Sequence, residues 1–210
     1  MPHAPAPPRT GAVRLGRPGY DQKSVVDTAV ALFNRHGYDA TSMGMLAAEL
    51  GVSKSAIYHH VPSKEDLLRI ALSRALGRLE GVLAAASELS STVEERLRFV
   101  IRATLDALID ELPYVTLLLR LRGNTPMERD ALERRRAFDH AVAELVSEAS
   151  REGTVRGDLE PHVVTRLIFG MVNSVTEWYR PGGRANRAAL ADTVVTMVFE
   201  GIAQDSQPSA

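Results

Sequence analysis

The sequence contains no cysteine and has almost no net charge, and both absences exclude classes of protein. Without cysteine among its 210 residues, the chain cannot use thiol catalysis, disulfide scaffolds or cysteine-ligated metal centres. Lysine and arginine number 25 against 26 aspartates and glutamates, for a formal net charge of −1. A protein that coats nucleic acid without specificity is expected to be much more basic.

Long apolar runs are also missing. No uninterrupted stretch approaches the roughly 18 apolar residues that span a bilayer. Residues 1–19 are rich in proline and alanine and lack the apolar core of a signal peptide. We therefore expect a cytoplasmic protein without a membrane partner. The rest of the composition, 45% apolar and 24% charged, is typical of a globular chain that buries an ordinary core.

Apolar residues recur at helical spacing between the prolines, as at Val26, Ala29, Val30 and Phe33. No segment alternates apolar and polar residues like a half-buried strand, so we expect an all-α fold. Capping pairs are expected at Ser63–Asp66, Ser91–Glu94 and Thr125–Glu128. The expected helices cover residues 21–36, 42–50, 54–60, 64–89, 92–112, 115–121, 126–152, 161–179 and 187–203.

The most informative segment is residues 41–67, which reads as two short helices joined by a tight turn. Ala47 is small where two helices would cross, and Gly51 can adopt the left-handed conformation that ends a helix. Ser53 then caps the second helix, and Ile57 anchors it against the first. This pattern predicts a helix-turn-helix over about residues 42–61, whose second helix enters the DNA major groove.

An ordinary helical hairpin in a bundle core is the alternative. The second helix favours DNA binding, because its face opposite the anchors carries hydrogen-bonding groups suited to phosphates or base edges. These groups are Ser53, Lys54, Ser55, Tyr58 and His59.

At these residues the chain resembles a known family. Residues 20 to about 79 are similar to the N-terminal domain of TetR-type transcriptional regulators. Ser55-Ala56 replaces the commoner Gly-Thr, and His59-His60-Val61 replaces the usual ending; both differences concern base preference. The matching motifs are Ala31-Leu32-Phe33, Gly37-Tyr38, Ala40-Thr41-Ser42, Leu46-Ala47, Gly51-Val52-Ser53, Ile57-Tyr58 and residues 63–68.

The resemblance implies a set of DNA contacts. A hydroxyl at the start of the first short helix and a lysine after the motif would bind phosphates, and the second helix would face bases and backbone. The implied DNA-binding residues are Thr41, Ser42, Ser53, Lys54, Ser55, Tyr58, His59 and Lys64.

Neither a metal centre nor a catalytic centre is expected, and no cofactor. Adjacent residues on a helix point about 100° apart, so His59 and His60 cannot chelate one ion together. The chain lacks the G-x-S-x-G, H-E-x-x-H and phosphate-loop motifs. An acyl-group enzyme using His140 or His162 as a base is a remote alternative.

Residues 80–205 are expected to form a helical ligand-binding and dimerisation domain, after a DNA-binding domain at 20–79 and a flexible tail at 1–19. Two wide apolar stripes near the C-terminus would pack face to face in a homodimer, which would suit a palindromic operator. The resemblance also implies that these two helices form the dimer interface. The stripes consist of Leu167, Ile168, Met171, Val172, Val175 and Trp178, then Leu190, Val194, Val198 and Ile202.

Two further strings, at 118–124 and 170–183, resemble a TetR branch that responds to acyl-CoA thioesters. Such a repressor would leave its operator when an acyl chain fills a long apolar slot with arginines at the mouth. A regulator of the same family that senses drugs is the alternative, although few aromatics and many arginines argue against it. The implied ligand residues are Leu117, Phe138, Phe169, Asn173 and Trp178, with Arg120, Arg122 and Arg180 at the mouth. Most arginines could instead pair with acidic residues on a solvated face.

The N-terminal tail generates one prediction. Arg9, Arg14 and Arg17 lie in it without an acidic neighbour, so it can bind the minor groove or be a passive leader. Deleting residues 1–17 should weaken DNA binding and flatten its salt dependence, because phosphate contacts are lost. Titrations at several salt concentrations measure this slope, and an unchanged slope would identify a passive leader.

Overall fold

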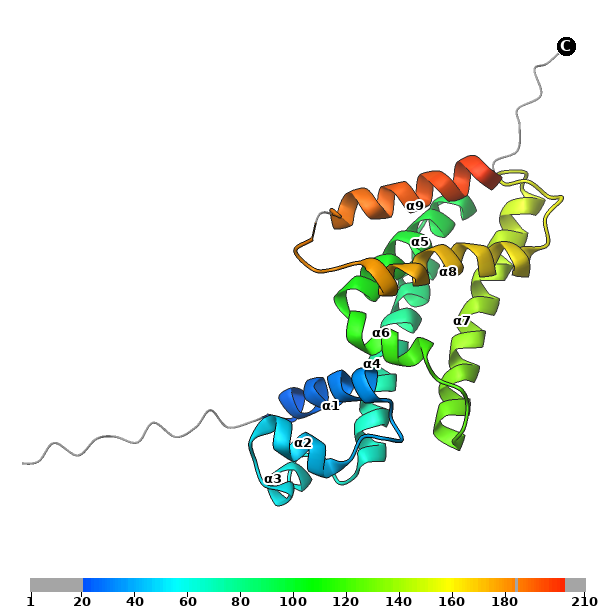
Figure 1. The fold of residues 1–210 in the computed structure, drawn as a ribbon. Helices are drawn as coiled ribbons and strands as arrows, with labels where there is room; N and C mark the ends of the chain where they lie inside the picture. Colours follow the sequence, from blue (N-terminus) through cyan, green and yellow to red (C-terminus); the bar gives the residue numbers. More distant parts are fainter. Residues whose placement is uncertain (1–20, 184, 203–210) are drawn as a thin grey trace, which may run out of the picture.

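A computed structural model describes residues 21–183 and 185–202, which form nine α-helices and no strand (Figure 1). The all-α prediction is confirmed. The tail with its three arginines lies outside the described residues. The helices are α1 (Gln22–His36), α2 (Met43–Leu50), α3 (Lys54–Tyr58), α4 (Lys64–Ser87), α5 (Val93–Asp110), α6 (Leu112–Leu119), α7 (Pro126–Arg151), α8 (Pro161–Trp178) and α9 (Arg187–Ile202).

Two predicted helix starts are wrong by a few residues. Helix α6 begins at Leu112 rather than at residue 115, because Pro113 falls in its first turn, where a missing N–H costs no hydrogen bond. Helix α5 is capped by Thr92 instead of Ser91, in a capping box with Glu95. The predicted caps Ser63 and Thr125 are confirmed, since each accepts a hydrogen bond from the backbone three residues on.

Helices α1, α2 and α3 form a small unit at one end of the molecule, which we call the reading head (Figure 1). Gly51 ends α2 with φ of 65°, the left-handed conformation that the turn requires. Ile57 of α3 is 1% exposed and packs into the head's apolar core. The turn and this anchor fix the angle at which α3 leaves α2.

Helix α4 joins the reading head to the larger sensor domain, α5–α9. It packs against α1 in the head and against α5, α6 and α7 in the sensor domain. The expected boundary between residues 79 and 80 falls inside this continuous 24-residue helix, so both units share it. Within the sensor domain α5 is central, because it contacts α4, α6, α7, α8 and α9.

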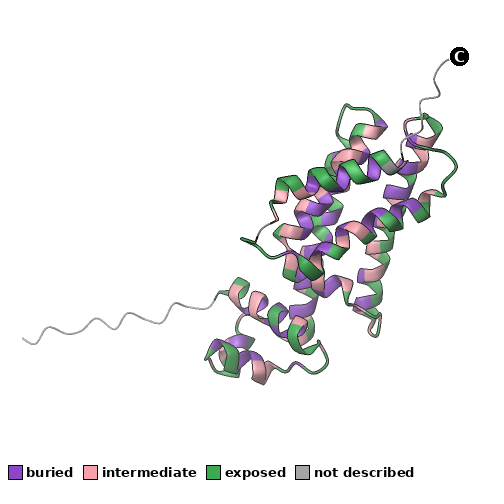
Figure 2. Ribbon diagram, turned by 45° about the horizontal axis from the view of Figure 1, so that its top comes forward, coloured by how far each residue is buried: buried purple, intermediate pink, exposed green. Residues whose placement is uncertain are grey.

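The apolar stripe predicted on α8 divides into two faces. Figure 2 shows buried and exposed residues alternating along the helices of this domain. On α8, Ile168, Val172 and Val175 are buried in the protein's own core, while Leu167 and Trp178 are 65% and 49% exposed. The prediction that the whole stripe meets a partner is therefore too broad. On α9 the division is similar, since Val194 and Val198 are buried. Met197 remains 59% exposed.

Among the residues that the structure describes, no helix combines the length and hydropathy needed to cross a membrane.

Candidate functional site

The outward face of α3 brings five of the predicted DNA-binding residues together. Ser53 caps the helix by accepting a hydrogen bond from the backbone N–H of Ala56 at 3.2 Å. Tyr58 is 48% exposed, which is unusual for so large an aromatic side chain. With Ile57 turned inward, the opposite face can meet a major groove. The exposed residues on it are Ser53, Lys54, Ser55, Tyr58 and His59.

The structure separates Thr41 from Ser42, which the sequence treats alike. Thr41 is 3% exposed, and its hydroxyl donates to the carbonyl of Gly37 at 2.8 Å. Ser42 is exposed and caps α2, accepting from the N–H of Met45. The prediction that Thr41 faces a phosphate is thus corrected, because its hydroxyl satisfies a backbone carbonyl inside the head. Ser42 alone of the pair faces solvent at the start of α2.

Lys64 also differs from its predicted role as a phosphate ligand. Its Nζ donates to the carbonyls of Tyr38 at 2.9 Å, Thr41 at 3.0 Å and Asp39 at 3.4 Å. The ammonium group also lies 4.3 Å from the centre of the Tyr38 ring. All three donors of the lysine are therefore engaged. Lys64 ties α4 to the loop between α1 and α2 rather than pointing at DNA.

Three of the predicted ligand residues meet in a cavity inside the sensor domain, which we call the inner cavity. The rings of Phe138 and Phe169 lie 5.3 Å apart, and Asn173 completes that wall. The cavity measures only about 30 Å³. The inner cavity is therefore not the long apolar slot expected from the sequence, because α4–α8 close around this space.

Thr104, on α5, is an inner-cavity residue that the sequence analysis missed. It is 4% exposed, and its hydroxyl has no hydrogen-bond partner in the described part of the chain. The side-chain amide of Asn173 forms no hydrogen bond there either. A buried polar group without a partner costs about 1–3 kcal/mol, so it usually serves a ligand or a water. The signal for Thr104 was a hydroxyl interrupting the apolar face of α5.

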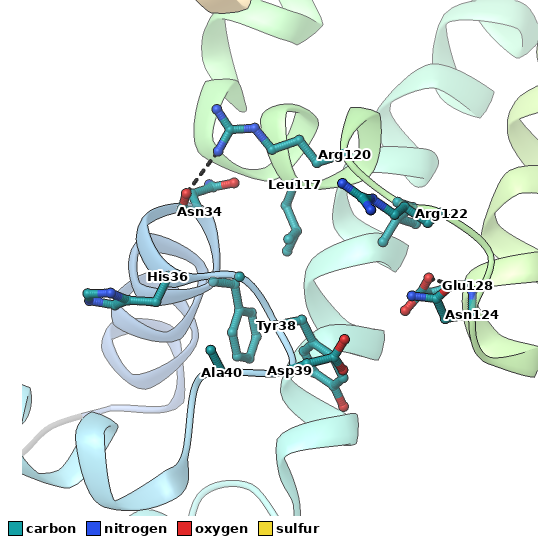
Figure 3. Close-up of a pocket in the computed structure, with 13 residues that line it drawn as sticks. Asn34, His36, Tyr38, Asp39, Ala40, Leu117, Arg120, Arg122, Asn124 and Glu128 are labelled. Carbon is teal, nitrogen blue, oxygen red and sulfur yellow. Dashed lines mark hydrogen bonds between the residues drawn. The ribbon is translucent and has the colours of Figure 1, made fainter.

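Leu117, Arg120 and Arg122 lie elsewhere, in a pocket of about 610 Å³ between the reading head and α6, which we call the junction pocket (Figure 3). Arg120 reaches from the end of α6 and donates to the carbonyl of Asn34 on α1 at 2.8 Å. No lining residue is common to this pocket and the inner cavity. The predicted ligand set is therefore divided, and Arg120 and Arg122 do not stand at the mouth of the inner cavity.

The two remaining predicted ligand residues line neither space. Trp178 ends α8 on its exposed side. Arg180 is exposed and donates to the backbone carbonyl of Tyr179 at 2.9 Å. Trp178 lies in the last turn of α8 and Arg180 just after it, and neither lines the inner cavity, so the structure does not support their predicted place at the ligand.

A polar cluster behind the junction pocket was also missed. The buried hydroxyl of Tyr114 on α6 donates to the carboxylate of Asp27 on α1. Arg74 on α4 donates to the same hydroxyl at 3.2 Å and forms an ion pair with Glu111 at 2.7 Å. Burial, together with the hydrogen bond to Asp27, raises the pKa of Tyr114 above its ordinary value, so the hydroxyl stays protonated. We call these four residues the junction network.

The exposed recognition helix and its helical partner domain define the class of helix-turn-helix DNA-binding regulators. Residues 25–70 match the family model described as "Bacterial regulatory proteins, tetR family", and residues 90–202 match "Tetracyclin repressor-like, C-terminal domain". The chain belongs to the TetR family and is a DNA-binding transcriptional repressor, not an enzyme.

Similar proteins include several regulators of lipid metabolism. The fatty acid metabolism regulator protein of Bacillus subtilis is 24% identical over 89% of this chain and 96% of its own length. SCO3833, a TetR-family member from Streptomyces coelicolor A3, has a crystal structure with TM-score 0.77 and 50% identity, covering 86% of this chain and 91% of that one. AibR, solved with isovaleryl coenzyme A and operator DNA, has TM-score 0.73 and 27% identity, covering 85% and 97%.

The position of Lys64 leads to a prediction that separates a structural lysine from a DNA-binding one. Lys64→Met should lower the free energy of unfolding by about 1–3 kcal/mol, because three carbonyls lose a charged donor. It should leave the slope of log affinity against log salt concentration unchanged. Lys54→Met should reduce that slope by about 0.9 for each protomer bound to the operator, as expected for one lost phosphate contact per copy.

Urea unfolding and operator titrations at several salt concentrations measure both quantities. Arg151→Met serves as the control, since Arg151 lies exposed in the last turn of α7 and forms no hydrogen bond or ion pair within the described residues. A reduced slope for Lys64→Met would restore its predicted contact with phosphate.

Proposed function

We propose that this protein is a homodimeric repressor that binds a palindromic operator and leaves it when an acyl-CoA thioester enters the sensor domain. The operator contacts would come from Ser42 and from the outward face of α3 at Ser53, Lys54, Ser55, Tyr58 and His59. Since its partner is chromosomal DNA, the protein would act in the cytoplasm. The observation that carries the choice of effector is the buried, unpaired hydroxyl of Thr104 beside the aromatic wall of the inner cavity.

The chemistry of the inner cavity suits a thioester. Phe138 and Phe169 offer an apolar wall to an acyl group. Thr104 offers a buried hydroxyl without a partner, and Asn173 offers a part-exposed amide donor. A thioester carbonyl is an acceptor for either. The structure of AibR with isovaleryl coenzyme A supports the same class of ligand.

The size of the cavity supports release by ligand. Pockets for small molecules usually measure at least ~300 Å³. At about 30 Å³, the inner cavity must expand before an acyl group fits. A ligand that binds only the expanded state shifts the protein toward that state, and by reciprocity operator DNA weakens ligand binding by the same factor.

Helix α6 provides the route from the cavity to the reading head. Val115 and Leu118 line the inner cavity, while Tyr114 bonds to α1 and Leu117 lines the junction pocket. An eight-residue helix moves as a unit, so ligand that displaces one of its faces also displaces the other. The reading head would then change its position relative to the sensor domain.

The exposed apolar side chains of α8 and α9 support a homodimer. Val163, Leu167 and Trp178 lie one to four turns apart on α8, and Met197 lies on α9. Their exposed fractions range from 49% to 65%, and large apolar patches of this kind mark interaction surfaces. A second copy of the chain would bury both helices in a four-helix interface.

The effector assignment predicts a specific pattern of release. Fluorescence anisotropy of the protein on DNA from its own upstream region should fall on titration with acyl-CoA thioesters of suitable chain length. Free CoA, as the control, should leave the complex intact. Tight DNA binding that no thioester disturbs would eliminate this effector class and favour a repressor that senses drug-like compounds.

Thr104→Val should raise stability while lowering ligand affinity. Valine has the shape of threonine without the unsatisfied hydroxyl, so the free energy of unfolding should rise by about 1 kcal/mol. The dissociation constant of the active thioester should increase about fivefold to tenfold, through loss of one hydrogen bond. Thermal unfolding and calorimetric titration measure the two effects. A loss of stability with unchanged affinity would contradict the role given to Thr104.

The dimer assignment predicts that Leu167→Glu yields a monomer, because burying a carboxylate in the interface is costly. Operator affinity should then fall at least tenfold, since the two half-sites are no longer bound together. Leu89→Glu, at a residue 40% exposed beyond the end of α4, is the matched control and should remain dimeric. Sedimentation velocity distinguishes the two states, and a dimeric Leu167→Glu variant would refute the interface.

A further inference from the structure

A second recess opens on the surface between α7 and α8, and the operator and acyl-group assignments do not use it. It measures about 310 Å³. Two arginines and two histidines contribute to it from both helices, so four nitrogen-bearing side chains converge there. Its lining residues are Arg136, Asp139, His140, His162, Thr165 and Arg166. We call it the α7–α8 recess.

The two arginines of the recess are free to bind a ligand. Arg136 and Arg166 are exposed, and neither forms a hydrogen bond or an ion pair within residues 21–183 and 185–202. Arg134 provides a contrast on the same helix, because its guanidinium donates to both carboxylate oxygens of Glu80 at 2.8 and 2.9 Å. A free guanidinium binds phosphate oxygens in a bidentate manner.

The histidines add further donors beside the arginines. The imidazole rings of His140 and His162 stack across the two helices, with centroids 5.5 Å apart and planes 14° apart. Within the described residues no group of three or more potential ligands is arranged to hold a metal ion. The stacked rings are therefore better suited to hydrogen bonding with an anion than to chelation.

Three acidic residues lie near the recess, and none of them forms an ion pair with Arg136 or Arg166 within the described residues. Glu160 is occupied at the start of α8, where its carboxylate accepts from the N–H groups of His162 and Val163 at 3.2 and 2.8 Å. Glu144 lies one turn further along α7, with a carboxylate oxygen 3.9 Å from Nε2 of His140. Asp139 faces both Arg135 and Arg166; burial raises the pKa of its carboxyl, and the two arginines partly oppose that effect.

Asp139 also connects the recess to the inner cavity. It lines both spaces, with Arg136 and Arg166 on the solvent side and Phe138 and Phe169 on the other. A ligand that passes Asp139 would therefore place an anionic end outside and an apolar end inside. This is the chemical plan of an acyl-CoA thioester, which carries phosphates at one end and an acyl group at the other.

We propose that the α7–α8 recess binds the phosphate-bearing end of the effector through Arg136 and Arg166, while the acyl group enters the inner cavity past Asp139. This inference rests on the proposed effector class. In this proposal Arg136 and Arg166 bind the phosphates, in place of Arg120, Arg122 and Arg180, which the sequence analysis had expected to do so.

The test compares two double variants that lose the same charge. Arg136→Gln/Arg166→Gln removes the recess arginines, and Arg122→Gln/Arg180→Gln removes two arginines from the alternative site. Calorimetry measures the binding of isovaleryl-CoA and of the isovaleryl thioester of N-acetylcysteamine, which carries no phosphate. The recess variant should bind the CoA thioester at least tenfold more weakly and the phosphate-free thioester unchanged. Melting temperature and operator affinity should match the unmodified protein, because both arginines are exposed.

Each other outcome overturns a defined part of the assignment. Equal weakening in both double variants, or weakening only in Arg122→Gln/Arg180→Gln, would refute the recess. Should the unmodified protein bind neither thioester, acyl-CoA thioesters of longer chain length are titrated next. The effector class fails if none of them binds, and free CoA then tests the recess separately. If the unmodified protein binds free CoA and only the recess variant loses that binding, the phosphate site is upheld. If the unmodified protein does not bind free CoA, the phosphate site is refuted together with the effector class.

Discussion

The hydrogen bond between Tyr114 and Asp27 is the contact on which the arrangement of the two domains depends. It joins α6 of the sensor domain to α1 of the reading head. Arg74, on a third helix, α4, donates a further hydrogen bond to the hydroxyl of Tyr114. Tyr114 is only 4% exposed, so loss of this bond would leave a buried hydroxyl unpaired. These polar contacts among α1, α4 and α6 add to the apolar packing that joins the two units in one core.

Helix α6 connects this hydrogen bond to the inner cavity, where the proposed ligand would bind. One face of the helix lines a nearly closed cavity, and the other carries the contacts to α1. Packed helices change between discrete arrangements rather than deforming continuously, so in the proposed mechanism a ligand that opens the cavity would shift α6 as a body. The unpaired hydroxyl of Thr104 is a cost in the closed state, and a bound ligand would remove it.

The structure has separate spaces where the sequence analysis expected a single ligand pocket. The inner cavity holds the aromatic wall, the junction pocket lies between the domains, and the α7–α8 recess holds free arginines. Arginines that are close together in the sequence can therefore lie in different surroundings. Arg134 is paired with Glu80, whereas Arg136, two positions later, points into the recess. A change of about 200° around the helix axis separates them.

The sequence alone determined the helices, the turn at Gly51 and the outward face of α3, because caps, prolines and helical periodicity act over a few residues. The wrong predictions at α5 and α6 concerned only where each helix begins, and they also arose from effects over a few residues. Only the tertiary structure decided that Thr41 and Lys64 turn inward and that Leu117 and Phe138 line different spaces. The physical reason is that burial and hydrogen-bond partners depend on which helices pack together, and those helices are distant in the chain.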